Sequence, residues 1–174
     1  MDIKVFGERN TATNALIKVI ETNSDTRCIP GTASGIDPAA LRRARKREFS
    51  TWLKERTLDG VFRGVPDQMT WKHAATNFTD ADAFRDTHVI FTVRHPASWL
   101  LGLYRKPYHI LSARPDSFAE FIRMSWKTVA RERLNRCRMS LPDLYETKLR
   151  RYDDFAAKLA DVGASHSFVR FEDF

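Results

Sequence analysis

The start of the chain combines a short apolar segment, a polar loop and a helical pattern, and this order restricts the fold more than any other feature. Ile3 to Phe6 is apolar and partly β-branched, as expected of a buried strand, and it ends at Gly7. From Thr13 onward the apolar residues recur at the spacing of one helix face, at Ala15, Leu16, Val19 and Ile20. A strand that leads through a loop into a helix is typical of a parallel α/β unit.

The rest of the chain alternates between β-rich and helical segments. The clearest strand is 88–93 (His-Val-Ile-Phe-Thr-Val), which is almost continuously apolar and therefore predicts burial on both faces. Further strands are predicted over 68–73 and 167–171, and helices over 38–56, 96–105, 117–137 and 143–162. One or two helical turns are predicted over 79–85, with Thr79 as the N-cap. The pattern predicts one α/β domain over 1–174, with a parallel sheet flanked by helices.

Charge and composition narrow the partners and the compartment. Lys and Arg number 29 against 22 Asp and Glu, so the net charge of +7 favours an anionic partner such as a nucleotide, a polysaccharide, a nucleic acid or a lipid headgroup. The basic runs at 42–47 and 131–138 fit either a solvated surface or the steering of an acidic ligand. No apolar stretch reaches the ~18 residues of a membrane span, and the strand at the start leaves no room for a secretory signal. Cys28 and Cys137 lack CxxC spacing, so we expect a cytoplasmic protein without a structural metal.

The loop from Gly7 to Asn14 is the first candidate binding site. The N-terminus of the following helix offers unpaired N–H groups and the positive end of a dipole, both of which suit a phosphate. Side chains at Thr11, Thr13 and Asn14 can add hydrogen bonds, and Arg9 can add a charge. Simple capping of the helix by a threonine explains the same residues, and both interpretations stay open.

Two absences point away from nucleoside triphosphate chemistry. The GxxxxGK[ST] pattern, which holds a γ-phosphate and Mg²⁺, does not occur. The best buried strand ends in Arg94, where an enzyme of that class needs an acidic metal ligand. A phosphate-binding α/β domain without this apparatus suits a nucleotide chemistry that needs no magnesium.

Four segments, in order along the chain, resemble motifs of the sulfotransferase family. Residues 5–16 (Val-Phe-Gly-Glu-Arg-Asn-Thr-Ala-Thr-Asn-Ala-Leu) are similar to the 5′-phosphosulfate loop of the bacterial type that opens with Gly-Glu-Arg-Asn. Residues 91–96 (Phe-Thr-Val-Arg-His-Pro) resemble the strand that leads to the family's 3′-phosphate-binding Arg-x-Pro. Trp71-Lys72-His73 lies between them, where the family carries its catalytic histidine, and 168–174 is similar to a later family strand. Together the matches span most of the chain.

The resemblance implies a three-layer, P-loop NTPase-like domain that transfers a sulfuryl group from PAPS (3′-phosphoadenosine 5′-phosphosulfate) to a hydroxyl or amine acceptor. The product nucleotide is PAP (adenosine 3′,5′-bisphosphate), and no metal is required. His73 is the implied catalytic base, and Arg9 or Lys72 is implied to stabilise the charge on the leaving oxygen. The implied donor-binding residues are Arg9, Asn10, Thr11, Ala12, Thr13, Asn14, Arg94 and Ser98.

The chain departs from the family pattern at three positions and at its end. Asn10 stands where the family loop has lysine, and Ala12 stands where it has glycine. Gly102 replaces a helix serine for which Ser98, one turn earlier, can substitute. The Gly-rich donor loop of many relatives would follow Phe174, so a short natural protein, a truncated chain and a degenerate member with weak activity are all open.

Other aromatic and histidine residues have no assigned chemistry. Trp99, Tyr104, Tyr108 and Phe121 fit either core packing or a ligand pocket, and Trp52 and Trp126 are assigned to packing. No role is assigned to His95, His109 or His166. Two alternative functions stay open: a non-catalytic module that binds anions or nucleic acid on the same scaffold, and a small-molecule kinase. Nucleic acid is the less expected partner under the leading hypothesis.

Overall fold

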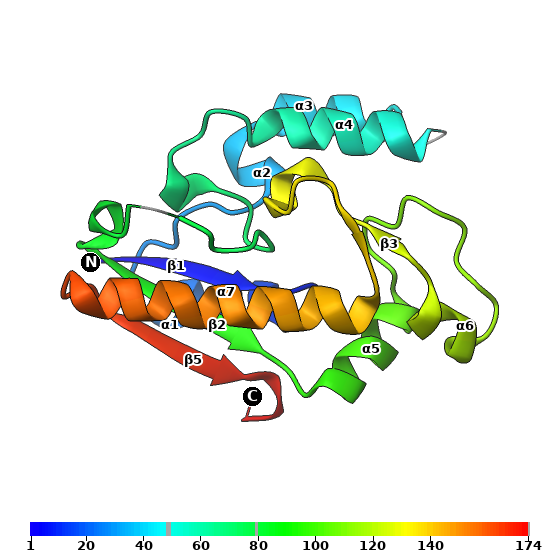
Figure 1. Ribbon diagram of the computed structural model, residues 1–174. Helices are drawn as coiled ribbons and strands as arrows, with labels where there is room; N and C mark the ends of the chain where they lie inside the picture. Colours follow the sequence, from blue (N-terminus) through cyan, green and yellow to red (C-terminus); the bar gives the residue numbers. More distant parts are fainter. Residues whose placement is uncertain (48–49, 79, 174) are drawn as a thin grey trace.

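A three-stranded parallel sheet organises the domain in the computed structural model, which describes residues 1–47, 50–78 and 80–173. Its strands β1 (Asp2–Gly7), β2 (Thr87–Val93) and β5 (His166–Arg170) lie in the order β1-β2-β5, as Figure 1 shows. The register places Phe6 opposite Phe91 and Phe91 opposite Phe168. The predicted parallel sheet flanked by helices is confirmed.

The helices form the remaining layers around this sheet. They are α1 (Thr13–Asn23), α2 (Ala33–Ile36), α3 (Pro38–Arg45), α4 (Thr51–Val61), α5 (Pro96–Arg105), α6 (Phe118–Arg123) and α7 (Leu141–Asp161). A small antiparallel pair, β3 (Trp126–Lys127) and β4 (Arg138–Met139), lies apart from the main sheet. Short 3₁₀ turns occupy 67–69, 82–84, 130–132 and 171–173.

Alternation along the strands assigns α1 and α7 to opposite faces of the sheet. Val5 and Ile90 share an apolar cluster with Leu16 of α1. Phe6 and Phe91, one position further along each strand, belong to the opposite cluster with α7. Figure 1 shows α1 behind the sheet and α7 in front of it. The sheet is therefore covered on both faces, which explains why 88–93 is continuously apolar.

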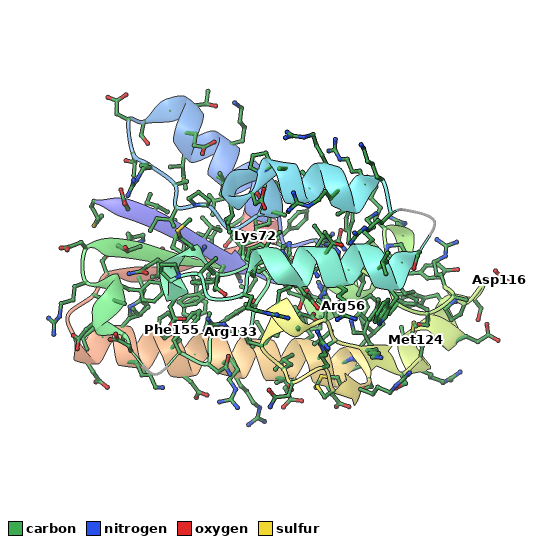
Figure 2. All side chains as sticks on the ribbon, turned by 90° about the horizontal axis from the view of Figure 1, so that it is seen from above. Arg56, Lys72, Asp116, Met124, Arg133 and Phe155 are labelled. Atoms are coloured by element: carbon green, nitrogen blue, oxygen red, sulfur yellow. The ribbon has the colours of Figure 1, made fainter. Side chains whose placement is uncertain are left out.

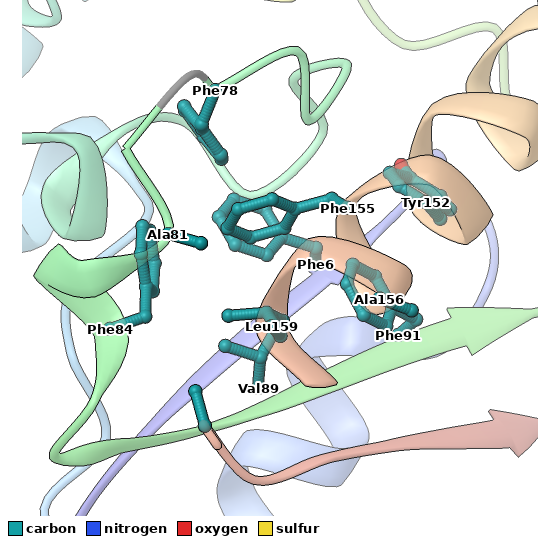
Figure 3. Close-up of a cluster of buried hydrophobic side chains, with 11 residues drawn as sticks. Phe6, Phe78, Ala81, Phe84, Val89, Phe91, Tyr152, Phe155, Ala156 and Leu159 are labelled. Carbon is teal, nitrogen blue, oxygen red and sulfur yellow. The ribbon is translucent and has the colours of Figure 1, made fainter. Parts of the chain in front are cut away.

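The main core is a group of closely packed aromatic rings between β1, β2 and α7 (Figure 3). The Phe155 ring lies 4.9 Å from Phe78 and 5.1 Å from Phe84, measured between ring centroids, and meets both edge to face. Phe91 lies against the same ring at 6.4 Å and stacks on Phe168 of the edge strand at 5.0 Å. Edge-to-face and stacked pairs at these separations are favourable in addition to their burial.

A second core lies beyond the ends of the strands, among α5, α6 and the start of α7. Trp126 is buried there, so its assignment to packing is confirmed, and Trp99 and Phe121, for which packing and a ligand pocket were both open, are packed in the same core. Trp52 is different: its side chain is 55% exposed on α4, and the expectation that it packs in the core is wrong.

Two predicted elements in the first half of the chain differ from the structure. The helix over 38–56 is two helices, because the chain turns at Lys46 and Arg47 and the Ser50 side chain caps a new helix at the Leu53 N–H. The segment 68–73 is not a strand but a 3₁₀ turn followed by a loop. Thr79, the predicted N-cap, and Phe174 lie outside the described residues.

The predicted helix over 117–137 is also wrong. Helix α6 ends at Arg123, and Arg133, Asn135 and Arg136 all have positive φ, which a right-handed helix cannot accommodate. After α6 the chain instead forms β3 and the turn at 130–132, which carries Arg131 and Glu132 into the interior, and then reaches β4. Within the described ranges no helix is both long and apolar enough to cross a membrane.

The aromatic core predicts that two phenylalanine substitutions lower the free energy of unfolding by very different amounts. Phe155→Ala removes a fully buried ring and should lower the free energy of unfolding by about 3–5 kcal/mol. Phe168→Ala removes a ring that is 43% exposed on the edge strand and should cost less than half as much. Chemical denaturation of both variants measures the difference, and equal losses would show that α7 does not anchor the core.

Candidate functional site

A cavity of about 390 Å³ lies at the end of β1, against the N-terminus of α1. The loop contributes Arg9, Asn10 and 12–14 to its wall, and the neighbouring loop contributes 71–73. The opposite wall is formed by α2, α3 and α4 together with Tyr108, His109 and Arg131. The cavity therefore brings together both segments in which sequence reasoning placed donor binding and catalysis.

The N-terminus of α1 has no side-chain cap. Ala12 occupies the N-cap position with φ of 65°, and its side chain accepts no hydrogen bond from the helix. Ala12, Thr13 and Asn14 all line the cavity. The first N–H groups of a helix have no partner within the helix, so they are available to an anion here. The capping interpretation of Thr11 and Thr13 is not what the structure shows.

Thr11 itself is turned away from the cavity. Its hydroxyl donates to the Glu8 carbonyl at 2.6 Å and lies 2.8 Å from the Thr92 hydroxyl. These contacts fix the loop to β2. Thr11 does not line the cavity. Its side chain is therefore not placed for the predicted contact with the donor nucleotide, and only its backbone N–H remains for that role.

The Lys72 ammonium is the cation that lies at the N-terminus of α1. Its side chain is 3% exposed, lines the cavity, and donates from Nζ to Asn14 Oδ1 in the first turn of α1. Burial lowers the pKa of Lys72 to about 8, so the ammonium is mostly charged at neutral pH. No carboxylate is bonded to Nζ among the described residues, and its charge is therefore available to an anion.

The loop that carries Lys72 is fastened to the sheet. The Lys72 carbonyl accepts from the Gly7 N–H at 2.9 Å, and the Lys72 N–H donates to the Gly31 carbonyl at 3.0 Å. Lys4 of β1 adds two bonds from its buried ammonium, to the carbonyls of Pro30 (2.9 Å) and Thr70 (2.8 Å). Burial and the charge of Lys72 lower the pKa of Lys4 to about 7. The cation at the cavity is thus held by main-chain contacts on both sides.

His73 is fixed as one tautomer. Its Nδ1 lies 2.6 Å from the Gly7 carbonyl, which can only accept, so Nδ1 carries the proton and Nε2 keeps a free lone pair. Burial, reinforced by the charges of Lys72 and Arg9, holds the pKa of His73 well below its usual value. The imidazole is therefore neutral at physiological pH and keeps the Nε2 lone pair free, although the lowered pKa makes it a weaker base than an ordinary histidine.

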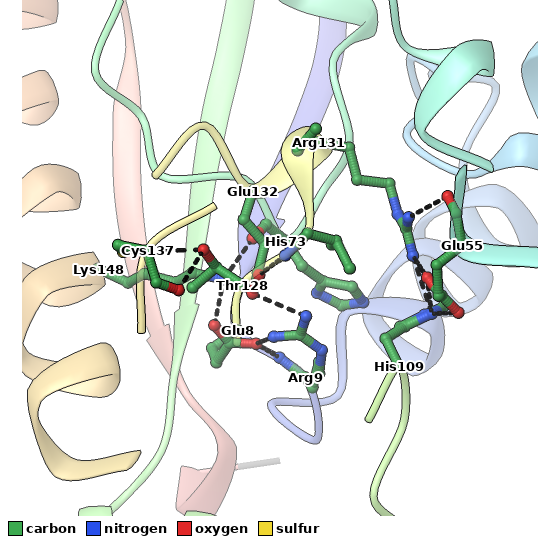
Figure 4. Close-up of polar contacts among 12 residues, drawn as sticks. Glu8, Arg9, Glu55, His73, His109, Thr128, Arg131, Glu132, Cys137 and Lys148 are labelled. Carbon is green, nitrogen blue, oxygen red and sulfur yellow. Dashed lines mark hydrogen bonds and ion pairs between the residues drawn. The ribbon is translucent and has the colours of Figure 1, made fainter. Parts of the chain in front are cut away.

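Arg9 belongs to a closed ring of four buried charges (Figure 4). It lies 2.7 Å from Glu8 Oε1 and 2.7 Å from Glu132 Oε1. Lys148 completes the ring, 3.0 Å from Glu132 Oε1 and paired with Glu8 on its other side. Two carboxylates thus neutralise the guanidinium, which also lies on the rings of Trp71 and Trp126. Arg9 lines the cavity, but most of its charge is balanced within the protein.

Arg94 approaches the loop from the other side. Its Nη1 donates to the Asn10 carbonyl at 3.0 Å, and its guanidinium lies 3.9 Å above the Phe171 ring. It borders a second cavity, of about 420 Å³, rather than the one that holds Lys72 and His73. The guanidinium packs against Gly102, where an added Cβ would come within 2.9 Å of Nη1. Ser98 lies half-buried on α5 and lines neither of these cavities.

The structure adds a histidine to the cavity wall that sequence reasoning left without a role. His109 Nδ1 lies 3.1 Å from Glu55 Oε1 and 2.9 Å from Arg131 Nη2. His109 and His73 both meet the Trp71 ring edge to face, at 5.3 and 5.0 Å. Nothing in the sequence signals this group, because its members come from α4, an irregular loop and the 130–132 turn.

Comparison with known proteins supplied no relative for the chain. No protein-family model, no curated protein and no solved structure matches it. Among the described residues no group of three or more His, Cys, Asp and Glu side chains could hold a metal ion, and the metal-free reaction stays a prediction.

The charge ring predicts a strong and pH-dependent effect at Glu132. Glu132→Gln leaves Arg9 and Lys148 with one carboxylate between them and should lower the free energy of unfolding by about 3–5 kcal/mol. Glu146→Gln, which breaks an exposed ion pair with Arg150, should cost under about 1 kcal/mol. Urea denaturation at neutral pH tests both.

Burial alone would raise the pKa of Glu132, but Arg9 and Lys148 outweigh it and hold that pKa at about 2. Because the folded pKa lies below the usual 4.5, this contribution is present above about pH 4.5 and is lost as the pH falls toward 2. The variant should lose stability less steeply over this range. A slope equal to that of the native protein would contradict the ring.

The left-handed backbone at Ala12 predicts a stabilising substitution. Ala12→Gly removes the steric cost of φ at 65° and should raise the free energy of unfolding by about 1 kcal/mol, or the Tm by about 2–4 °C. Ala15→Gly, at a position of α1 with ordinary right-handed backbone, should instead lower it by up to about 1 kcal/mol. Thermal unfolding followed by circular dichroism distinguishes them, and a loss of stability in both would mean that Ala12 is not strained.

Proposed function

We propose that this chain is a sulfotransferase-like enzyme that transfers a sulfuryl group from PAPS to a hydroxyl or amine acceptor, on a P-loop NTPase-like domain. The observation that carries the proposal is the meeting of three features in one cavity: the uncapped N-terminus of α1, the Lys72 ammonium and the neutral His73. The first two suit the 5′-phosphosulfate of the donor, and the third suits proton removal from an acceptor.

The chain's own residues account for each charge that develops in such a transfer. His73 Nε2 takes the proton of the acceptor as the acceptor oxygen or nitrogen forms its bond to sulfur. Lys72 stabilises the negative charge that appears on the 5′-phosphate oxygen as its bond to sulfur breaks. The N–H groups of α1 hold the same phosphate in place. The products are the sulfated acceptor and PAP, and the proton ends on His73.

Lys72, rather than Arg9, replaces the lysine of the family loop in this proposal. The Arg9 guanidinium is already bound by Glu8 and Glu132. Lys72 has no such acidic partner among the described residues and lies at Asn14. Arg9 then positions the loop before the N-terminus of α1. It acts on the donor phosphate through its electrostatic field and not through a direct hydrogen bond.

Arg94, just before α5, is proposed to hold the 3′-phosphate of the donor, with Ser98 in the first turn of α5 as the second predicted contact. The Arg94 Nε is buried and has no hydrogen-bond partner within the described residues. Its N–H is therefore left to donate a hydrogen bond to an anion. A phosphate there would also exploit the bidentate geometry of a guanidinium.

A non-catalytic anion-binding module is the second candidate, and one observation favours it. Arg94 and Lys72 face different cavities. One donor nucleotide would therefore have to place its 3′-phosphate and its 5′-phosphosulfate on opposite sides of Asn10. A protein that binds only one phosphate group at α1 would show the same geometry around Lys72.

Titration calorimetry with adenosine 3′,5′-bisphosphate tests the donor site, with ATP and Mg²⁺ as the comparison. The bisphosphate should bind without metal, and the affinity should fall as the pH rises above about 8, where Lys72 loses its charge. Lys72→Met should weaken binding about ten-fold or more, whereas Lys18→Met on the exposed face of α1 should not. Absence of bisphosphate binding in a folded sample would refute the donor site.

His73→Asn separates the enzyme from the binding module. It should abolish sulfuryl transfer from PAPS, in a screen of phenol, alcohol and amine acceptors, while leaving bisphosphate affinity within about two-fold. His166→Asn on β5 is the control. Transfer that survives His73→Asn would remove this residue from the mechanism, and binding without transfer in the native protein would favour the module.

A further inference from the structure

A groove separate from the two cavities described above lies behind the Glu55–Arg131 pair, between α4 and the β3 segment. It encloses about 250 Å³. Trp52, Arg56 and Arg63 line it from the α4 side, and Lys127 and Arg136 line it from the other. Figure 2 looks down on this part of the molecule and labels Arg56 beside α4.

The groove presents positive charge to solvent. Its four basic side chains, Arg56, Arg63, Lys127 and Arg136, are all exposed. Its two acidic residues, Glu55 and Asp59, are buried and bound to Arg131, which neutralises much of their charge. Arg136 approaches Asp59 at 3.6 Å, and the other three have no carboxylate partner among the described residues.

Helix α3, which packs beside α4, extends the positive field. It carries exposed basic side chains from its middle to the turn that follows, at Arg42, Arg43, Arg45, Lys46 and Arg47. Of these, Arg43 is paired with Asp37 at 3.3 Å. A polyanion is thus attracted to this whole side of the molecule.

An exposed tryptophan lies among these cations. Trp52 is 55% exposed, while the other three tryptophans are between 0% and 4% exposed. The Arg56 guanidinium lies 5.2 Å from the centre of its ring. A flat aromatic face flanked by cations along a groove is the arrangement that binds single-stranded nucleic acid, because bases stack on the ring while phosphates meet the cations. A sulfated or carboxylated polysaccharide has no aromatic ring to stack on Trp52.

We propose that this groove binds single-stranded nucleic acid, with one base stacked on Trp52 and the flanking phosphates bound by Arg56, Arg63, Lys127 and Arg136. The inference does not depend on the function of the α1 cavity, because the two sites share no basic residue and are separated by the Glu55–Arg131 pair. It gives a site of its own to nucleic acid, which the sequence made the less expected partner.

Fluorescence anisotropy with a labelled oligothymidylate of about 20 nucleotides tests the groove. The slope of log affinity against log salt concentration should be about −3, since each phosphate contact to a single strand contributes about −0.7. Trp52→Ala should weaken binding roughly ten-fold. Trp52→Phe keeps a stacking ring and should stay within about three-fold of the native affinity, but should lose the quenching of tryptophan fluorescence by the oligonucleotide.

Lys127→Ala and Lys18→Ala form a matched pair that removes the same charge inside and outside the groove. Only the first should weaken binding, by about two- to five-fold, and reduce the magnitude of the salt slope by about 0.7. Dextran sulfate is the second probe. Equal weakening by the two lysine variants, tight binding of dextran sulfate with no stacking effect at Trp52, or no oligonucleotide binding at low salt would each overturn the proposal.

Discussion

Four buried charges join the end of β1 to the rest of the domain. Glu8 and Arg9 come from the loop after β1, Lys148 from α7 and Glu132 from the 130–132 turn. Removing an ion from water costs several kcal/mol, and the cost is offset only when each charge has close partners of the opposite sign. Because each of the four has two such partners, the ring fixes three separate parts of the chain relative to one another. The loop, and with it the start of α1, owes its position to this arrangement.

The same ring also decides which cation remains for a ligand. Arg9 is the residue that the sequence places nearest to the family lysine, yet its charge is taken up by Glu8 and Glu132. Lys148 reaches the His73 carbonyl at 2.7 Å and thereby holds the loop that carries Lys72. The protein thus uses a buried arginine for structure and leaves at the cavity a nearby lysine whose ammonium donates to an amide oxygen and, within the described residues, meets no carboxylate.

Local patterns were sufficient for the sheet and for most of the helices around it. The strand at 88–93, the opening strand and helix, and the long helix α7 all follow from apolar periodicity, and the structure confirms them. Periodicity failed at 117–137, where apolar spacing imitates a helix but Glu132 and Arg131 are drawn inward by charges distant in sequence. It failed at Trp52 as well, because nothing local distinguishes a packed indole from an exposed one. The tautomer of His73 and the Glu55–His109–Arg131 contact depend on such long-range geometry and could not be predicted.

Gly102 has a consequence for how the chain can vary. The Arg94 guanidinium occupies the space that any larger side chain at position 102 would need, since a Cβ would lie 2.9 Å from Nη1. A serine introduced there must displace Arg94, and a shorter residue at 94 would remove the obstacle to serine. Substitutions at these two positions are therefore epistatic, and their effects on stability will not add. A change to serine at 102 therefore needs either a shift of the Arg94 side chain or a shorter residue at position 94.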